Sequence, residues 1–197
     1  ASSVWRVLLV VALAAYCRSD DQDQTLQTGV IGSKVVEAVV GRIDASCVFT
    51  EDKLFMRRLA FVESHDGMNP ETYRDGYHGG IWQVDEDMFK KTQSSSARFV
   101  LFEHIKRIQQ EFGIDWPSAK WTDLRKPLYS ALAARLYLLV NENGGDGIPR
   151  PIPAQAAYWH KFYRTNGDEE AFGTAVESLE KRCTTNQADL CFMLDGS

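Results

Sequence analysis

The sequence predicts a mainly helical α+β domain with one small β-hairpin region. Between residues 33 and 180, apolar residues recur three and four positions apart, which is the spacing of amphipathic helices. The exception is residues 72–84, where the turn pair Asp75-Gly76 stands between aromatic and β-branched residues. The chain has 197 residues, 44% of them apolar, so it is long enough to bury one core.

Two helices are expected before the hairpin region. The first begins at Ser33. Its apolar positions are Val36, Val39, Val40 and Ile43. The second begins after Thr50, which is a good N-cap, and Gly67 is a suitable stop. Its apolar face carries Phe55, Leu59 and Val62.

Four helices are expected after the hairpin region. Residues 98–112 carry Leu101, Ile105, Ile108 and Phe112 on one face. Pro127 suits the first turn of the next helix, which runs to residue 142 and ends near Gly144. Pro153 opens a third, and Asp168 caps a fourth. The apolar positions of these last two are Ala156, Trp159, Tyr163, Phe172, Val176 and Leu179.

The first 17 residues have the pattern of an export signal. Residues 7–15 form an unbroken apolar run that follows Arg6, ends in small alanines and is too short to cross a bilayer. A buried core helix is the alternative, which the acidic segment after the run disfavours. We expect a signal peptide at 1–17, a flexible arm at 18–32, the folded domain at 33–182 and a C-terminal tail at 183–197. The protein is then secreted, with no membrane attachment after the signal is removed.

Charge and cysteine content exclude several classes of partner. The formal net charge is −5, and it becomes −6 once the signal is removed. An acidic chain without a basic face is not expected to bind nucleic acid. The sequence has no CxxC or HExxH spacing of a metal site, so no metal or cofactor is expected. We also expect the protein to be a monomer. Of the cysteines that follow the signal, Cys183 can pair with Cys191 or with Cys47, and both pairings remain open.

Glu63 is the strongest candidate for chemistry. It follows Leu59 by four positions and Phe55 by eight, so it shares their apolar face. Burial raises the pKa of a carboxyl group, and a carboxyl that stays protonated can act as a general acid. Asp75 and Asp85 follow near the glycine-rich hairpin region and offer further carboxylates at the rim of the expected cleft. The alternative is a structural Glu63 at a frayed helix end, pointing into water.

Two blocks of the sequence resemble a known family. Residues 63–67 read Glu-Ser-His-Asp-Gly and are similar to the ESHxG segment of goose-type lysozymes, and Asn69-Pro70 resembles the NP of soluble lytic transglycosylases. Residues 80–85 read Gly-Ile-Trp-Gln-Val-Asp and resemble the GLMQVD segment of the same lysozymes. The resemblance extends over about residues 33–180, but only 63–85 is specific. It implies a lysozyme-like helical domain with a small β-hairpin region beside the active-site cleft.

The resemblance also implies a role for each matching residue in these two blocks. Glu63 matches the general acid, and Ser64 matches the small polar residue beside it. Gln83 matches a glutamine that lines the sugar cleft, where Gly80 lets the backbone approach the substrate. Asp85 matches an aspartate proposed to place a water molecule.

Four other assignments are less direct. Asp75 aligns only roughly with a second aspartate that is proposed to help place the water molecule in these lysozymes. Residues 156–158 resemble the start of a third block, AYNAG, in which Tyr158 matches a tyrosine that contacts the catalytic glutamate. Trp82 stands where Met or Leu is usual, and Trp159 replaces part of the third block. Each of these tryptophans either stacks on a sugar ring or packs in the core.

The expected function is a secreted glycoside-cleaving enzyme without a cofactor. Its substrate class is a β-1,4-linked amino-sugar polymer, with peptidoglycan as the first choice and chitin as the second. Hydrolysis by water and attack by the sugar's own 6-hydroxyl both remain open. The main alternative is an inactive lysozyme-like glycan-binding or structural secreted protein, which the acidic charge favours because bacterial walls are anionic. A weaker alternative is a calcium binder that uses residues 85–87, although the EF-hand loop pattern is missing.

Overall fold

The computed structural model describes residues 23–142 and 147–185. Within these ranges the chain forms helices and turns, without a strand, so the expectation of a mainly helical domain is confirmed. The α-helices are α2 (Ser33–Ser46), α3 (Phe55–Ser64), α4 (Glu86–Gln93), α5 (Ser95–Phe112), α6 (Pro127–Glu142), α7 (Ile152–Phe162) and α8 (Glu169–Thr185). The short 3₁₀ helices are η1 (Gln24–Leu26), η2 (Pro70–Tyr73), η3 (Trp116–Ser118) and η4 (Trp121–Arg125).

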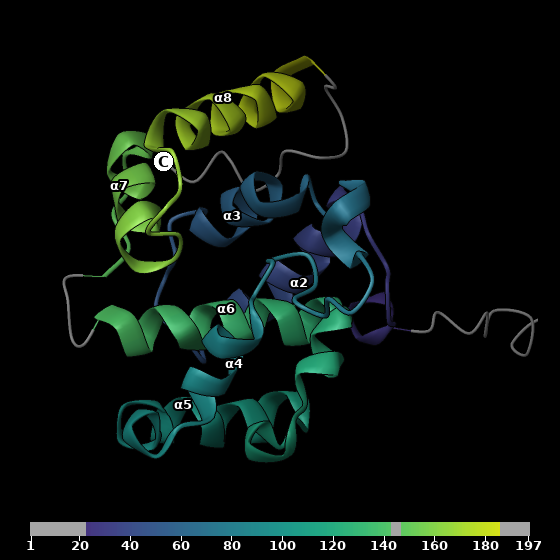
Figure 1. Ribbon diagram of the computed structural model, residues 1–197, viewed down its shortest axis with the longest axis vertical. Helices are drawn as coiled ribbons and strands as arrows, with labels where there is room; N and C mark the ends of the chain where they lie inside the picture. Colours follow the sequence, from purple (N-terminus) through teal and green to yellow (C-terminus); the bar gives the residue numbers. More distant parts are fainter. Residues whose placement is uncertain (1–22, 143–146, 186–197) are drawn as a thin grey trace, which may run out of the picture.

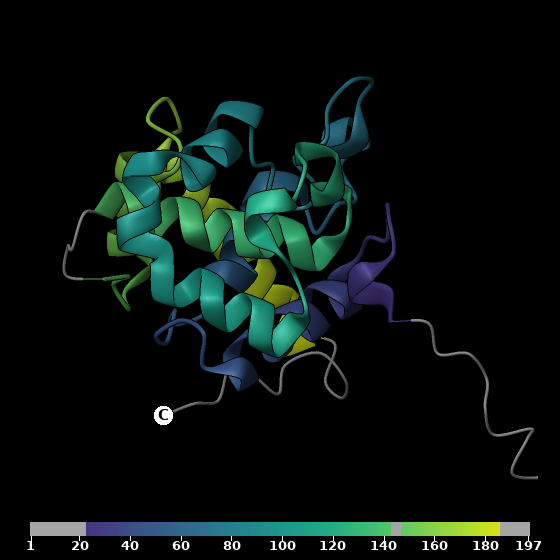
Figure 2. The ribbon, with the colours of Figure 1, turned by 90° about the horizontal axis from the view of Figure 1, so that it is seen from below.

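Helix α6 is the centre of the fold. It crosses the middle of the molecule, with α3, α7 and α8 on one side and α4 and α5 on the other (Figure 1). Seen from below, α5 lies against α6 (Figure 2). The six consecutive residues 131–136 of α6 are all buried. A helix that is apolar on nearly every side is stable only when other elements surround it, so the near-continuous apolar run places α6 in the core.

The start of α3 differs from the expectation. The helix begins at Phe55 rather than directly after Thr50. The carboxylate of Asp52 accepts hydrogen bonds from the backbone amides of Leu54 at 3.0 Å and Met56 at 2.8 Å. These bonds satisfy amides at the helix start that have no partner within the helix. The capping side chain is therefore Asp52, and the predicted Thr50 cap was wrong.

The end of α3 also differs. The helix stops at Ser64 because His65 adopts a left-handed conformation with φ 50°. Gly67, the expected stop, lies beyond this turn, and its amide donates to the Ser64 hydroxyl at 2.8 Å. Glu63 consequently lies in the last turn of α3, beside the chain that follows.

The expected β-hairpin is absent from the described chain. Residues 72–84 instead form the end of η2 and a series of tight turns, in which Gln83 N bonds to Gly80 O and Val84 N to Gly79 O. A half-exposed hairpin buries alternate residues, but here the consecutive residues 79–84 are all buried. The hairpin prediction was wrong because glycine-rich turn signals were read as strand connections.

The structure adds one helix to those predicted, α4, and starts α5 earlier than expected. Asp85 directly precedes α4, and Glu86 and Asp87 lie in its first turn, where Glu86 pairs with Lys90 at 2.8 Å. This helix was not among the six that the sequence predicted. Helix α5 begins at Ser95 rather than residue 98. Its cap is Ser94, whose hydroxyl accepts from the amide of Ala97 at 3.2 Å.

Residues 23–32, expected to be part of a flexible arm, are instead packed against the domain. Asp23 caps η1 and pairs with Arg42 of α2 at 2.6 Å. The amide of Gly29 donates to the carbonyl of Arg125, and that of Gly32 to the carbonyl of Asp66. The predicted signal at 1–17 lies outside the described residues. Of the predicted tail at 183–197, residues 183–185 belong to α8 instead, and the rest lies outside the described residues. In the described part of the chain, helices are too short or too polar to span a bilayer.

Cys47 is a free, exposed thiol among the described side chains. The side chain of Cys183 and the whole of Cys191 lie outside the described part of the chain, so the two candidate pairings stay predictions.

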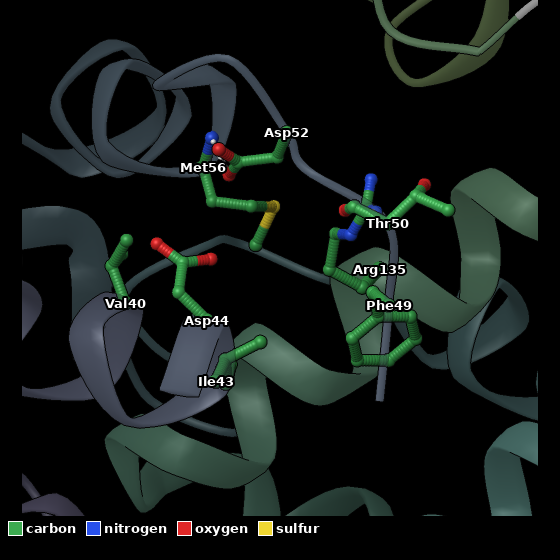
Figure 3. A pocket seen from close by; sticks show the side chains of 8 residues that line it. All are labelled: Val40, Ile43, Asp44, Phe49, Thr50, Asp52, Met56 and Arg135. Carbon is green, nitrogen blue, oxygen red and sulfur yellow. Dashed lines mark hydrogen bonds between the residues drawn. The ribbon is translucent and has the colours of Figure 1, made fainter. Parts of the chain in front are cut away.

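A small cavity lined by apolar and charged side chains lies beside the start of α3. It is about 10 Å³ in volume and lies between α2, the segment before α3 and α6. Asp44 of α2 points into it toward Asp52, and Arg135 of α6 lines another wall (Figure 3). Burial, together with the charge of Asp52, raises the pKa of Asp44 from 3.8 to about 6. Both carboxylates interact electrostatically with the buried Arg135, whose guanidinium donates to the carbonyl of Thr50 at 3.1 Å.

We expect the Asp44→Asn variant to be more stable than the wild type at pH 7.5. Folded Asp44 binds its proton more tightly than the unfolded chain does, so its contribution to the free energy of unfolding falls as the pH rises from about 4 to about 6. Because Asp44 is exposed to solvent, screening reduces the expected gain at pH 7.5 to only about 1 kcal/mol. Urea denaturation at pH 5 and 7.5 checks this. The variant should show a smaller difference between the two pH values, whereas exposed Asp75→Asn should behave as wild type.

Candidate active site

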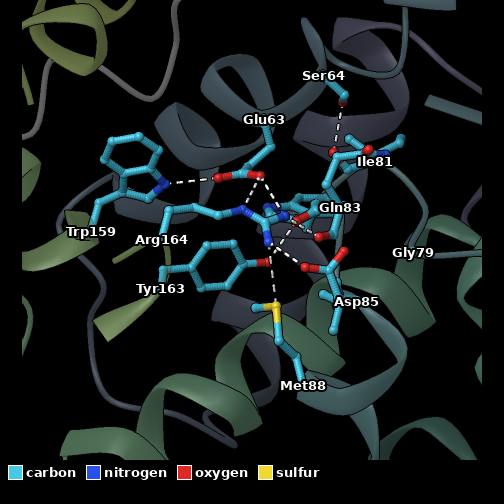
Figure 4. A network of polar contacts seen from close by, with 12 residues as sticks. Glu63, Ser64, Gly79, Ile81, Gln83, Asp85, Met88, Trp159, Tyr163 and Arg164 are labelled. Atoms are coloured by element: carbon cyan, nitrogen blue, oxygen red, sulfur yellow. Dashed lines mark hydrogen bonds and ion pairs between the residues drawn. The ribbon is translucent and has the colours of Figure 1, made fainter. Parts of the chain in front are cut away.

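Glu63 is buried at the end of α3 and is held from two sides. Its side chain is 6% exposed. Its Oε1 accepts a hydrogen bond from Trp159 Nε1 at 2.8 Å, and its Oε2 accepts from Arg164 Nε at 3.0 Å (Figure 4). The expected apolar face is confirmed, because Phe55 and Leu59 are both fully buried. The alternative of a frayed helix end pointing into water was therefore wrong.

Arg164 joins Glu63 to Asp85. It follows α7, and its Nη1 donates to Asp85 Oδ2 at 2.7 Å, while its Nη2 contacts both Glu63 Oε2 at 2.9 Å and the carbonyl oxygen of Gln83. Asp85, just before α4, also accepts from the Tyr77 hydroxyl at 2.9 Å. The side chain of Arg164 is 19% exposed and that of Asp85 is 49% exposed. The network thus runs from a buried carboxyl to one at the surface.

Burial and charge act in opposite directions on Glu63. Burial raises the pKa of Glu63 above its ordinary value of 4.5, while the Arg164 charge and the hydrogen bonds from Arg164 and Trp159 oppose that rise. Asp85 adds to the rise through its negative charge. Burial lowers the pKa of Arg164, but Glu63, Tyr163 and Asp85 more than compensate, so Arg164 stays charged. The protonation of Glu63 therefore depends on the balance between its burial and the charge of Arg164.

Ser64 and Gly80 position the backbone beneath the site. The Ser64 hydroxyl donates to the carbonyl of Ile81 at 2.6 Å, which fastens the end of α3 to the segment 80–85. Gly80 has φ +66° and lies against Leu124 and Ser130. Both residues are buried. Through these contacts Ser64 and Gly80 fix the backbone beneath Glu63.

Gln83 is also held by the protein. Its side-chain amide donates to the carbonyls of Thr72 at 3.1 Å and Gly80 at 2.7 Å, and its oxygen accepts from Arg74 at 3.1 Å. The residue is 8% exposed. In this conformation its side chain braces the loop, and its carbonyl oxygen contacts Arg164.

The two tryptophans are core residues. Trp82 is fully buried and donates through Nε1 to the carbonyl of Met56 at 2.9 Å, so of its two predicted roles the structure supports packing. Trp159 is 7% exposed and packs on Phe172. Stacking on a sugar ring needs an open face, which neither indole offers here. Trp159 instead contributes the hydrogen bond to Glu63.

Tyr158 and Asp75 lie away from the Glu63 network. The Tyr158 hydroxyl donates to Glu142 at 2.7 Å, so the expected contact with Glu63 was wrong. Neighbouring residues on a helix point about 100° apart, and it is Trp159 that faces α3. Asp75 lies exposed in a turn, and within the described chain no hydrogen bond or ion pair joins it to Glu63 or Asp85.

Arg164 and Tyr77 were missed by the sequence analysis. Arg164 lies 101 positions after Glu63, and it ends a stretch with no motif. Its only local signal is a cation directly after the apolar face of a helix, which is equally typical of a solvent-exposed arginine. Tyr77 belonged to the expected hairpin, where its hydroxyl had no assigned partner.

Comparison with protein-family models, curated proteins and solved structures finds no match for this chain. Among the described side chains, no three His, Cys, Asp or Glu residues are grouped so that they could hold a metal ion. The functional assignment therefore rests on the two sequence blocks and on the geometry of Glu63, Arg164 and Asp85.

Proposed function

We propose that this protein cleaves β-1,4-linked amino-sugar polymers, with Glu63 as the general acid and a lysozyme-like fold. The observation that carries the proposal is the buried Glu63 carboxyl at the end of α3, joined through one guanidinium to the half-exposed Asp85. Cleavage of a glycosidic bond needs an acid that protonates the leaving oxygen, and burial favours the protonated form. Peptidoglycan is the first substrate to test and chitin the second.

The hydrogen bonds of Glu63 suggest which oxygen carries the proton. Oε1 accepts from Trp159 in either protonation state, since an indole N–H is a donor only. Oε2 is therefore the oxygen that takes up the proton and donates it to the glycosidic oxygen. Arg164 must release Oε2 for this step, and it can do so while it keeps its contacts with Asp85 and the Gln83 carbonyl.

Asp85 is the second carboxylate of the proposed site. It is held by Tyr77 and Arg164, and half of its side chain remains exposed. As an anion it would stabilise the positive charge that develops at the sugar, and in a hydrolase it would orient the attacking water. A lytic transglycosylase would need no such water, because the 6-hydroxyl of the sugar attacks.

The proposal is tested by incubating the purified protein with bacterial cell walls and with chitin oligomers from pH 4 to pH 8. Mass spectrometry then identifies the new chain ends. Reducing ends indicate hydrolysis, and anhydro ends indicate transglycosylation. If neither substrate acquires new ends at any pH, the proposed activity is wrong.

A second candidate is a secreted glycan-binding protein without catalysis. The observation that favours it is the ion pair between Glu63 and Arg164, because an ionised carboxyl cannot donate a proton. Sedimentation with insoluble chitin or cell walls separates the two candidates. A pure binding protein would sediment with the polymer and release no fragments. Secretion itself stays a prediction, which mass spectrometry of the mature N-terminus in a secreting host would test.

A further inference from the structure

Arg164 makes an unusual set of contacts for one side chain. Three of its nitrogens reach two carboxylates and one backbone carbonyl, which come from α3, from the residue before α4 and from the turn at residue 83. Its Nη1 also lies 3.6 Å from the Met88 sulfur. Because 19% of the side chain is exposed, solvent or a ligand has access to part of it. The family resemblance gives this position no role.

We propose that Arg164 is a positioning residue that clamps the Glu63 carboxylate and controls when that carboxyl can take up a proton. This inference rests on the proposed function, in which Glu63 is the acid. In the clamped state Glu63 is an anion and cannot donate. When Glu63 takes up a proton its charge is cancelled, and Arg164 is then held mainly by Asp85.

The groups around Glu63 support this division of roles. Trp159 and Arg164 contact it from α7 and the segment after it, and Asp85 approaches from the start of α4. Tyr163 is buried, and its hydroxyl donates to the carbonyl of Trp82 at 2.6 Å. Burial raises the pKa of Tyr163, so it stays neutral. Of these groups Arg164 is the only cation, so it alone favours the ionised carboxyl by charge. Asp85 has the opposite effect, because it repels a negative Glu63 and also shares the guanidinium.

The opposite signs of these two effects allow a sharp test. Glu63 titration is followed by NMR in protein labelled with ¹³C at the glutamate carboxyls, with the signal assigned from the Glu63→Gln variant. Arg164→Met should move the titration midpoint of Glu63 to higher pH by on the order of one pH unit or more. Asp85→Asn should move it to lower pH. If Arg164 and Asp85 had only structural roles, their two variants would not shift the Glu63 midpoint in opposite directions.

Two further variants serve as controls. Arg57→Met removes an arginine of α3 that pairs with a different buried carboxylate, Asp66, at 2.7 Å, and it should leave the Glu63 midpoint unchanged. Arg164→Lys keeps the charge and should move the midpoint less than Arg164→Met does. If Arg164→Met does not fold, the test is whether Arg164→Lys still moves the Glu63 midpoint to higher pH while Asp85→Asn moves it to lower pH.

The clamp is wrong if the Glu63 midpoint fails to move, or moves in the same direction, in Arg164→Met and Asp85→Asn. Because the titration needs no substrate, this result is separate from the fate of the proposed activity. If the Glu63 midpoint shifts in opposite directions but the protein cleaves no glycan, the role of Arg164 is supported and the proposed enzymatic activity is refuted. If the protein cleaves glycans but the midpoint does not shift in this way, the proposed activity stands and the role of Arg164 is refuted.

Discussion

Glu63→Gln should reduce the rate of glycan cleavage by at least about a hundredfold, because general acid catalysis typically contributes that much or more. Glutamine has nearly the same shape as glutamate, and its single amide oxygen can still accept from Trp159, while its amide NH2 group replaces the oxygen that accepts from Arg164. It cannot donate an acidic proton to the leaving oxygen. The measurement is the rate at which new chain ends appear on cell walls or chitin oligomers, at the pH where the wild type is most active.

A matched control for this prediction is Glu37→Gln. Burial raises the pKa of Glu37 as it does that of Glu63, and Glu37 lies 3.8 Å from an arginine, Arg57. It belongs to α2, outside the network of Arg164 and Asp85. Its replacement should leave the cleavage rate near that of the wild type. A Glu63→Gln variant that is folded and cleaves within about threefold of the wild type would refute the assignment of the acid.

Gly80→Ala should cost the protein at least about 3 kcal/mol in the free energy of unfolding. A Cβ atom at this position would lie 2.0 Å from the carbonyl oxygen of Leu124 and 2.7 Å from the Ser130 side chain, and the backbone has φ +66°. Backbone cannot yield as a flexible side chain can, so the whole turn must move. Because this turn leads into Gln83 and Asp85, the ion pairs of Arg164 should be lost as well. Urea denaturation checks the free energy of unfolding.

Gly76→Ala is the matched control for Gly80→Ala. Gly76 has a similar φ of +69°, but an added Cβ would meet nothing within 4 Å. Only the backbone strain remains, which costs about 1 kcal/mol. The difference between the two variants therefore measures the close approach at Gly80. Equal losses of stability would contradict the packing described for the turn.

The helices could be predicted from the sequence because they depend on local spacing. The sequence predicted a helix from Pro127 to residue 142, and the structure forms it as α6 and buries its residues 131–136 together. The burial of Glu63 followed from its spacing to Leu59 and Phe55 in the same way. The hairpin prediction for residues 72–84 was wrong because Asp75-Gly76 and Gly79-Gly80 are equally compatible with a hairpin and with irregular turns. The close packing of Gly80 against Leu124, which is distant in the sequence, favours the irregular turns, and local sequence does not show it.

The site was predicted only in part for a similar reason. Glu63 and Asp85 come from the specific blocks, and the structure brings them to one arginine. Tyr158 and Trp159 were placed by a weaker block, and the assignment of the contact with Glu63 was wrong by one residue. Arg164 could not be found from local pattern, since its partners are 79 and 101 positions away. Long-range ion pairs leave no periodic signal in a single sequence.

The structure of the Glu63→Gln variant with a bound amino-sugar oligomer tests the central claim most directly. We predict that one glycosidic oxygen lies within hydrogen-bond distance of the residue 63 side chain, about 3 Å, with Asp85 on the other side of the sugar ring. The guanidinium of Arg164 should then remain on Asp85 and no longer contact residue 63. An oligomer bound with every linkage out of reach of residue 63 would contradict the account.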